Sequence, residues 1–496
     1  MTKILPVRLA ALALLAPLAA CAVGPDYRSP SAATLKVPEA FPSQPADAPA
    51  AADLSTWWRN FDDPVLSGLV GRALANNLDV ATAGARLAQA RANLRAAQGA
   101  QLPTAAVSGS ISRSVGRDSN SFVDPSNGVV ISSGGDTTVF QGTANVAWEA
   151  DVFGRLRRGV EAARATLEQA GENLHFAQLS VAAEVGSSYL DARQAQQRLI
   201  IARNNLASQD ETVQIVGWRV QAGLVSSLDL EQARQLRAQT AAGVGTQESA
   251  YTNAINRLAV LIGEAPGAVN TLMADNAPIP VPGDAAPAAI PADTIERRPD
   301  VRAAERGLAA EVARIGVATA DLYPALRLTG SFTGSGTTLS DAASQAFGNL
   351  VGAISAPIFQ GGQIRARINA QRAVADTAFA TYRSTVLTAI EEVDDAYAAL
   401  AASEKRETAL AQADEAARNA TLYARSQYRA GLIDFQSLLE SERSLLSSQD
   451  GRATARADRA RAYVQLYRAL GGGWQSAPAP APAGPYIVTP LIETAQ

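Results

Sequence analysis

The run from Phe140 to Val152, FQGTANVAWEADV, alternates two kinds of side chain. Its even positions read Phe, Gly, Ala, Val, Trp, Ala and Val, and its odd positions read Gln, Thr, Asn, Ala, Glu and Asp. Successive side chains of a strand point to opposite faces, so this period of two predicts a strand with one apolar and one polar face. Such a strand fits a half-buried soluble sheet or a membrane-spanning sheet whose apolar face meets lipid.

Three further runs alternate in the same way, at residues 105–112, 326–333 and 350–358. No other part of the chain resembles a second sheet against which these strands could pack, which favours the membrane setting. A sheet in lipid can leave no edge unpaired, and membrane barrels begin at about eight strands. Four strands therefore predict that several chains share one barrel.

The rest of the chain is strongly helical in pattern. No proline occurs between Pro125 and Pro266, or between Pro357 and Pro478. Residues 363–429 would form a helix about 100 Å long at the usual rise per residue. Apolar side chains recur there every seven residues, at Phe379, Val386, Val393 and Leu400, with a second seam at Tyr382, Ala389, Ala396 and Tyr397. This repeat predicts left-handed supercoiling against neighbouring helices.

The chain contains two similar halves. Ala222-Gly223-Leu224 recurs 208 residues later as Ala430-Gly431-Leu432, and Asp79-Val80 recurs 221 residues later as Asp300-Val301. The difference between the offsets predicts a longer loop in the first half, within the Ser/Gly/Asp-rich residues 112–138. Each half has a helix (77–101 and 299–322), two strands and a long helical pattern that is broken once. We therefore assign a first repeat at 64–273, a Pro/Ala-rich linker at 274–291 and a second repeat at 292–473.

The N-terminus has the layout of a secretory signal peptide over residues 1–20, with Lys3 and Arg8 before an apolar run at 9–18. Cys21 is the only cysteine, so it cannot form an intrachain disulfide. Two interpretations of Cys21 remain: an accidental thiol or a modified residue. The order Leu-Ala-Ala-Cys resembles a bacterial lipoprotein signal, which implies acyl chains on Cys21 as a membrane anchor. Ala22 rather than Asp follows, which by the same resemblance favours the outer membrane.

Residues 21–63 form the expected lipidated N-terminal arm, and residues 474–496 the expected disordered Pro/Ala-rich tail. Trp57, Trp58 and Phe61 are the expected packing anchors of the arm. The acidic cluster at 391–395 is interpreted as a solvated face or the wall of a water-filled tunnel.

Composition argues against several classes of function. A formal net charge of −4 argues against a nucleic-acid partner. With one histidine, His175, and one cysteine, a His/Cys metal site within the chain is not expected. No G-x-S-x-G elbow lies near a strand end. We therefore expect no enzyme, no catalytic residue, no metal and no cofactor apart from the lipid on Cys21.

Four motifs, taken in order, resemble the outer-membrane factors of tripartite efflux systems, most closely the lipid-anchored OprM/NodT type of the TolC superfamily. They are CAVGPDY from Cys21, WWRNFDDP from Trp57, RPDV from Arg298 and YRAGL from Tyr428. The resemblance spans essentially the whole chain after residue 20. It implies a mainly α TolC-like fold with a membrane β-barrel part. In such a homotrimer, three chains of four strands each would share a twelve-stranded outer-membrane barrel above a long periplasmic α-helical barrel.

The resemblance also implies partners and a location. A periplasmic adaptor (membrane fusion) protein and an inner-membrane pump, of the RND type, would feed the channel, which is lipid-anchored in the outer membrane and extends into the periplasm. The channel would conduct drugs or other toxic small molecules passively to the exterior.

Two groups of residues are expected to carry this function. The helix breaks Ala222-Gly223-Leu224 and Ala430-Gly431-Leu432 would be hairpin tips, because glycine readily takes a positive φ at a helix end. By resemblance these tips would contact the adaptor; a plain turn is the alternative.

Glu440, with Arg443 and Gln436, matches the position of the family's periplasmic gate. Three carboxylates near a symmetry axis would repel one another and raise each other's pKa. Two departures from the family are Glu where Asp is usual and Gln436 where a leucine is usual. An ordinary surface pair of Glu440 and Arg443 is the alternative.

Other functions remain open. An outer-membrane duct for metal export or type I protein secretion would share the same architecture. A coiled-coil lipoprotein that tethers the outer membrane to the cell wall is an alternative of a different class, but the four alternating runs argue against it because a tether needs no strands. The sequence names neither the transported substrate nor the particular pump.

Overall fold

The computed structural model describes residues 22–45, 54–115, 120–123, 130–133, 136–283, 289, 291–475 and 477. The expected signal peptide, Cys21 and most of the tail at 474–496 lie outside these residues.

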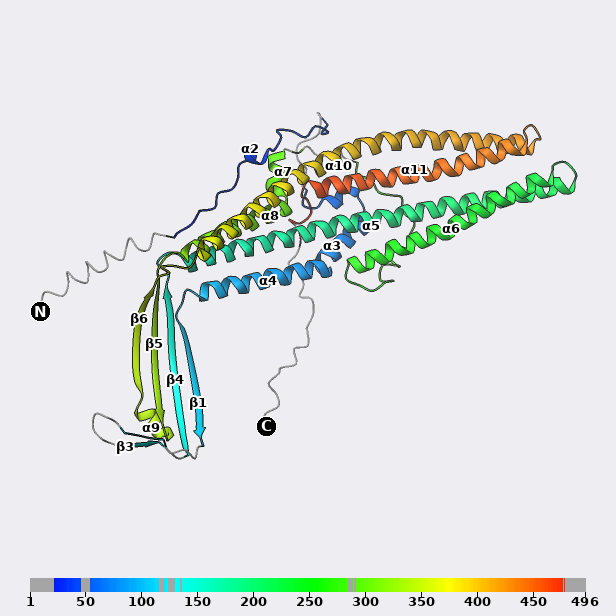
Figure 1. Cartoon of the computed structure of the whole chain (residues 1–496). Coiled ribbons are helices and arrows are strands. Elements are labelled where there is room, and N and C mark those ends of the chain that lie inside the picture. The colour runs from blue at the N-terminus through cyan, green and yellow to red at the C-terminus, as the bar shows by residue number, and fades with distance from the viewer. Residues whose placement is uncertain are drawn as a thin grey trace. The chain divides into compact units, whose positions relative to one another are not determined.

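The described residues form helices and strands in an order that repeats (Figure 1). The first half contains α2 (Ala32–Leu35), η2 (Trp57–Phe61), α3 (Pro64–Asn76), α4 (Leu78–Gly99), β1 (Thr104–Ser114), β2 (Asn120–Val123), β3 (Val130–Ser133), β4 (Thr137–Ala150), α5 (Arg155–Gln221) and α6 (Ser227–Leu261). The second half contains α7 (Pro291–Arg297), α8 (Pro299–Ala320), β5 (Ala325–Gly336), α9 (Leu339–Ser344), β6 (Phe347–Ser355), α10 (Gln363–Arg429) and α11 (Phe435–Ala469).

The chain divides into two compact units. One comprises residues 1–29, 89–167 and 306–380 and contains the strands. The other comprises residues 30–88, 168–305 and 381–496 and contains most of the helical hairpins.

The first unit is built on a four-stranded antiparallel sheet in the order β1-β4-β5-β6 (Figure 1). The register places Val146 opposite Ala105 on one side and Gly330 on the other, and Gly330 opposite Leu350. The apolar positions of all four runs therefore share one face, and the polar positions share the other. This confirms the four predicted strands, although β6 ends at Ser355, before Pro357, which cannot donate to a ladder.

The predicted longer loop of the first half contains structure of its own. The short strands β2 and β3 pair antiparallel as a second, two-stranded sheet, with Asn120 opposite Ser133. The connection from β1 to β4 is longer than the one from β5 to β6, as predicted, but the sequence analysis did not predict these two short strands within it. The second half has the short helix α9 instead.

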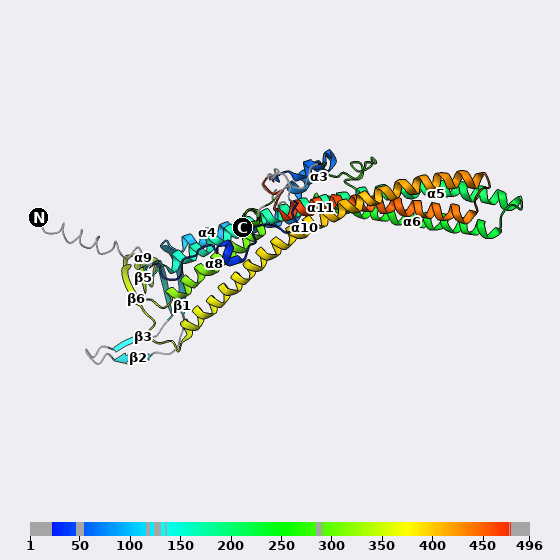
Figure 2. The same cartoon turned by 90° about the horizontal axis from the view of Figure 1, so that it is seen from above.

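The duplication is reproduced in the lengths of the helices. Helices α5 and α10 both have 67 residues, α6 and α11 both have 35, and α4 and α8 both have 22. Their first residues are separated by the same offsets that the sequence motifs show. In the second unit, α5, α6, α10 and α11 run alongside one another (Figure 2).

The predicted seven-residue seams are buried in this bundle. Val386, Val393 and Leu400 of α10 are almost inaccessible, as are Tyr382, Ala389, Ala396 and Tyr397. Phe379, the first residue of the predicted seam, is only half-buried. The burial of the other positions supports packing of α10 against neighbouring helices, and the left-handed supercoil stays a prediction.

The N-terminal segment of the second unit is anchored by aromatic side chains. Trp57 is fully buried and stacks on Tyr467 with ring centroids 5.5 Å apart. Trp58 and Phe61 meet Trp57 edge to face. Asp63 caps α3 by accepting from the backbone N–H groups of Val65 and Leu66. The expected role of these aromatic residues as packing anchors is confirmed.

Among the described residues, no helix is both long enough and apolar enough to cross a bilayer.

Candidate functional site

The two predicted breaks are tight helical hairpin tips. Gly223 and Gly431 have φ values of 71° and 72°, the left-handed region that favours glycine. The N–H of Leu224 donates to the carbonyl of Arg219 (2.8 Å), and that of Leu432 to the carbonyl of Gln427 (2.9 Å). These bonds close α5 and α10 with the pattern of a glycine C-cap.

The helices that leave the tips are capped by side chains. Ser226 and Asp229 form a reciprocal capping box at the start of α6. Asp434 accepts a hydrogen bond from the N–H of Ser437 (2.8 Å) at the start of α11. Each tip is therefore a defined turn between two closed helix ends.

The tip side chains face solvent. Ala222, Gly223, Ala430 and Gly431 are exposed, and a Cβ built on either glycine meets nothing within 4 Å. Leu224 and Leu432 are 72% and 75% exposed. An apolar side chain at the end of each hairpin is thus available to a partner.

Arg219, near the tip of the first hairpin, forms hydrogen bonds with the tip of the second hairpin. Its Nη2 donates to the carbonyls of Tyr428 (2.8 Å) and Arg429 (3.2 Å) at the end of α10. The guanidinium also lies 4.3 Å from the ring centroid of Tyr428. The carbonyl of Tyr428 also accepts from the N–H of Gly431 (3.0 Å), so the first hairpin adds to the hydrogen bonding at this helix end.

The three predicted gate residues lie on the first turns of α11, and all are exposed. Gln436 Nε2 donates to Gln232 Oε1 of α6 at 2.7 Å, a bond between the two hairpins. Within the part of the chain that the structure describes, Glu440 and Arg443 form neither an ion pair with each other nor a hydrogen bond with another side chain. The structure brings Gln436 to a partner and leaves Glu440 facing outward.

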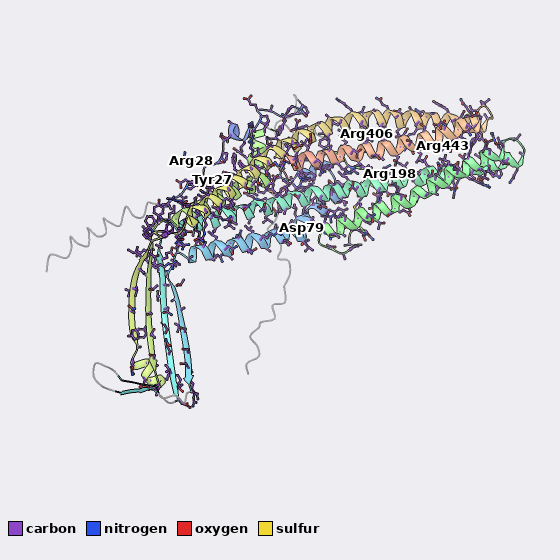
Figure 3. The ribbon with its side chains drawn as sticks, in the orientation of Figure 1. Tyr27, Arg28, Asp79, Arg198, Arg406 and Arg443 are labelled. Atoms are coloured by element: carbon purple, nitrogen blue, oxygen red, sulfur yellow. The ribbon has the colours of Figure 1, made fainter. Side chains whose placement is uncertain are left out.

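Arg443 lines a cavity of about 330 Å³ between α5, α6 and α11. Arg198 of α5 and Asp450 of α11 also line this cavity and form an ion pair with each other. Figure 3 labels Arg198 on α5 and Arg443 on α11.

Glu442, two residues beyond Glu440, is a buried carboxylate that the sequence analysis missed. It is 3% exposed and accepts hydrogen bonds from Thr212 Oγ1 (2.9 Å) and Arg425 Nε (3.3 Å). Burial raises its pKa, against the opposing effect of Arg425. Its place on the heptad seam of Leu438 and Leu445 is the signal that could have identified it.

Asp414 of α10 is a second buried carboxylate. It accepts from Arg418 Nε and Arg452 Nη1, each at 2.9 Å. These two arginines outweigh desolvation and hold the pKa of this carboxyl below its usual value. The bundle near the tips therefore has charged layers among its apolar ones.

The structure corrects in part the interpretation of the acidic cluster at 391–395 as a solvated face or tunnel wall. Glu392 pairs with the buried Arg298 at 2.6 Å, and Asp394 accepts from the N–H (2.7 Å) and hydroxyl (3.0 Å) of Ser43. Two of the four acids therefore hold structure instead of lining a solvated face. Their partners lie far away in the sequence, which is why a local pattern could not show them.

Residues 22–26 of the first unit are fixed against the start of α5. The N–H of Val23 donates to the carbonyl of Phe153 (3.1 Å), and Arg158 Nη2 donates to Asp26 Oδ1 (2.7 Å). Arg158 Nε also bonds the carbonyl of Val23 (3.2 Å). Val23 therefore lies beside the junction of β4 and α5.

The described residues contain no group of three or more His, Cys, Asp and Glu side chains arranged to hold a metal ion.

Three comparisons with known proteins agree on the family. A sequence profile described as outer membrane efflux protein matches residues 69–264 and 290–472, one match in each half. The chain is 31% identical over 462 residues to nodulation protein T of Rhizobium leguminosarum bv. trifolii, which covers 92% of this chain and 95% of that protein. It is 30% identical over 474 residues to the antibiotic efflux pump outer membrane protein ArpC of Pseudomonas putida, with coverage of 92% and 93%. Its fold matches the solved outer-membrane channel OprN with a TM-score of 0.82 and 34% identity, covering 92% of this chain and 100% of that one.

Proposed function

The chain belongs to the outer membrane efflux protein family, and from that premise we propose that three copies form one duct through which an inner-membrane pump, joined by a periplasmic adaptor, expels toxic small molecules. The family comprises outer membrane channels of efflux pumps, which are not enzymes. This chain is therefore a component of an outer-membrane channel. Its assembly, its lipid anchor and its cargo are what we propose.

The observation that carries the proposal is the exposed apolar face of the four-stranded sheet. Val107, Leu350 and Ile354 are 85%, 81% and 76% exposed on it. Among the described strands, β1 and β6 each have one edge without a partner. Lipid would cover the apolar face, but it cannot satisfy the free edges, so strands of further copies must close the barrel. Three copies give the twelve strands that the family resemblance implies.

Acyl chains on Cys21 would add a second attachment to the outer membrane. The contacts of Val23 and Asp26 support this, because they hold the chain next to Cys21 at the end of the membrane sheet. An anchor at that position would enter the periplasmic leaflet without straining the sheet.

The exposed tips support contact with the hairpins of a periplasmic adaptor. Gly431→Trp places a large side chain where nothing lies within 4 Å, so the bundle itself has room for it, apart from the strain of a positive φ. We expect this variant to keep its trimeric mass in detergent and to lose pump function. Unchanged drug resistance would contradict the role of the tip, and loss of the trimer would show that the variant acts on folding.

The cargo is proposed to be drugs or other toxic organic molecules, for which the antibiotic efflux relative offers support. The test is a susceptibility panel of antibiotics, dyes, detergents and toxic metal ions, applied to a strain without this protein and to the same strain carrying it on a plasmid. Restored resistance to several unrelated organic compounds is the expected result. Sensitivity to metal ions alone would favour the metal-export alternative, and loss of a secreted protein without any change in resistance would favour type I secretion.

A further inference from the structure

Helix α9, which joins β5 to β6, lies directly on the four-stranded sheet, at the end remote from the starts of α5 and α10 (Figure 1). Two glycines of β5 make room for it. A Cβ built on Gly334 would lie 2.0 Å from the carbonyl oxygen of Ala342, and one built on Gly336 would lie 2.6 Å from the backbone nitrogen of Ala342. Ala342 is itself buried, so the backbone of α9 is packed tightly against the strand.

The face that carries α9 is the apolar face of the sheet. Phe332, Gly334 and Gly336 follow one another at intervals of two, and residues two apart in a strand point to the same side. The pairing of β5 with β4 is regular over these positions, with Gly142 opposite Gly334, so no bulge turns the strand between them. Helix α9 therefore lies on the side that the proposed function places in lipid, and not on the polar side that would line the duct.

The level of α9 on this face corresponds to one edge of the membrane. The outward-facing positions of β5 run from Leu326 to Gly336 and cover about 33 Å along the strand. At the usual tilt such a strand crosses an apolar band about 25 Å tall. Helix α9 covers the last two of these positions, at the level where Ile111 of β1 is 71% exposed. Because α5 and α10 lead into the periplasm from the opposite end, this edge belongs to the outer leaflet.

The exposed side chains of α9 divide into an apolar side and a polar side. Leu339 and Ala343 are four residues apart, so they share one side of the helix. Ser340 and Ser344 share another in the same way. All four are exposed, and Leu339 is 74% exposed. A helix with one apolar and one polar side suits the boundary between acyl chains and head groups.

We infer that α9 is an interfacial helix that binds the outer leaflet of the outer membrane, with its Leu339 side among the acyl chains and its Ser340 side at the head groups. The inference rests on the proposed function, in which the sheet spans that membrane. Continuity of the surface supports it, since the lipid that covers Phe332 and Ile111 extends to α9 on the same face. The close contact with Gly334 holds the helix at this depth, so α9 fixes how far the strands enter the membrane.

The experiment measures the depth of single fluorescent labels on the full-length protein in phospholipid vesicles. Leu339→Cys carries the label on α9, and the vesicles contain lipid nitroxides placed either near the head group or near the end of the acyl chain. We expect the shallow nitroxide to quench this label more strongly than the deep one does. Val107→Cys, near the middle of the apolar face, should be quenched more strongly by the deep nitroxide. Protein with its native Cys21 alone gives the background.

Two glycine variants test whether the contact with β5 positions the helix. Gly334 and Gly142 lie opposite each other on the same face, but a Cβ on Gly142 meets nothing within 4 Å. In protein labelled at position 339, Gly334→Ala should displace α9 and reduce quenching by the shallow nitroxide. Gly142→Ala adds the same methyl group in open space and should leave the quenching unchanged.

The outcomes separate this inference from the proposed function. If neither nitroxide quenches the label at position 339 while the label at position 107 is quenched, α9 lies outside the lipid, and the inference is overturned while the membrane sheet stands. Equal depths for the two labels would also overturn it, because α9 would then not lie at the interface. Quenching that is the same in Gly334→Ala and Gly142→Ala would overturn the positioning by β5. An unquenched label at position 107 would instead refute the membrane sheet.

Discussion

Glu440 and Glu442 lie two residues apart on α11 but have opposite surroundings. Glu440 is exposed, and Glu442 is buried between α5 and α10. The heptad seam decides this difference, because Glu442 takes a position that Leu438 and Leu445 continue. The family resemblance directed attention to the exposed carboxylate, while the burial of the other depends on Thr212 and Arg425, which are distant in sequence and could not be identified from it.

The exposed carboxylate gives the first prediction. If three copies of Glu440 narrow the tunnel mouth, Glu440→Ala removes both their bulk and their charge. Single-channel conductance in a planar bilayer should then rise above that of the wild type. Glu415→Ala, which removes an exposed carboxylate of α10, should leave the conductance unchanged. Equal conductance of wild type and Glu440→Ala would refute the gate.

The buried carboxylate gives a prediction about pH. Burial raises the pKa of Glu442 above its usual 4.5, so the folded protein binds this proton more tightly than the unfolded chain does. Its contribution to stability is then complete below pH 4.5 and is lost as the pH rises through the folded-state pKa. The glutamine in the Glu442→Gln variant cannot ionise, so this variant should lose less stability than the wild type as the pH rises.

The measurement is the melting temperature of the detergent-solubilised protein at a series of pH values from 4 upwards. The difference between Glu442→Gln and wild type should grow in favour of the variant as the pH rises. Glu415→Gln, at an exposed position, should give a difference that does not change with pH. Parallel curves for Glu442→Gln and wild type would contradict the role of burial.

Among the elements, those with a complete local pattern were predictable. The alternation at Phe140 to Val152 and in its three companion runs predicted β1, β4, β5 and β6, and the register then placed their apolar positions on one face. The proline-free stretch and the Ala-Gly-Leu motif predicted α10 to within its observed bounds, and also the tip that follows it. Two features were not predicted: β2 and β3 have only four residues each, too few to show a clear alternation, and Gln436 meets Gln232, which is far away in the sequence, across two hairpins.

The short helix η2 gives a prediction about how elements are held together. Trp57 is fully buried and stacks on Tyr467 of α11, so Trp57→Ala removes a large contact and leaves a cavity. We expect a loss of about 3–5 kcal/mol in the free energy of unfolding. Leu78→Ala, at a position 63% exposed, should change it by less than about 0.5 kcal/mol. Thermal unfolding of the purified variants measures both, and equal melting temperatures for the two would contradict the anchoring role.

For the whole molecule, the proposed lipid anchor on Cys21 and the proposed membrane sheet would be two separate attachments to the membrane. Cys21→Ser should abolish the incorporation of labelled palmitate while the protein still sediments with outer membranes, because the sheet keeps its apolar face in lipid. The wild type should carry the label, and intact-mass measurement should show the acyl chains. An unlabelled wild type would refute lipidation, and release of the variant into the periplasm would refute the independence of the sheet.

The equal lengths of the two hairpins also constrain how this chain can evolve. Arg219 reaches the end of α10 only because α5 and α10 both have 67 residues and end at the same level. Deleting one heptad from each arm of a single hairpin would draw its tip back by about 10 Å, and this bond would be lost. A change in length is therefore tolerated only when both halves acquire it, so related channels should gain or lose hairpin length as paired insertions or deletions, 208 positions apart in this numbering.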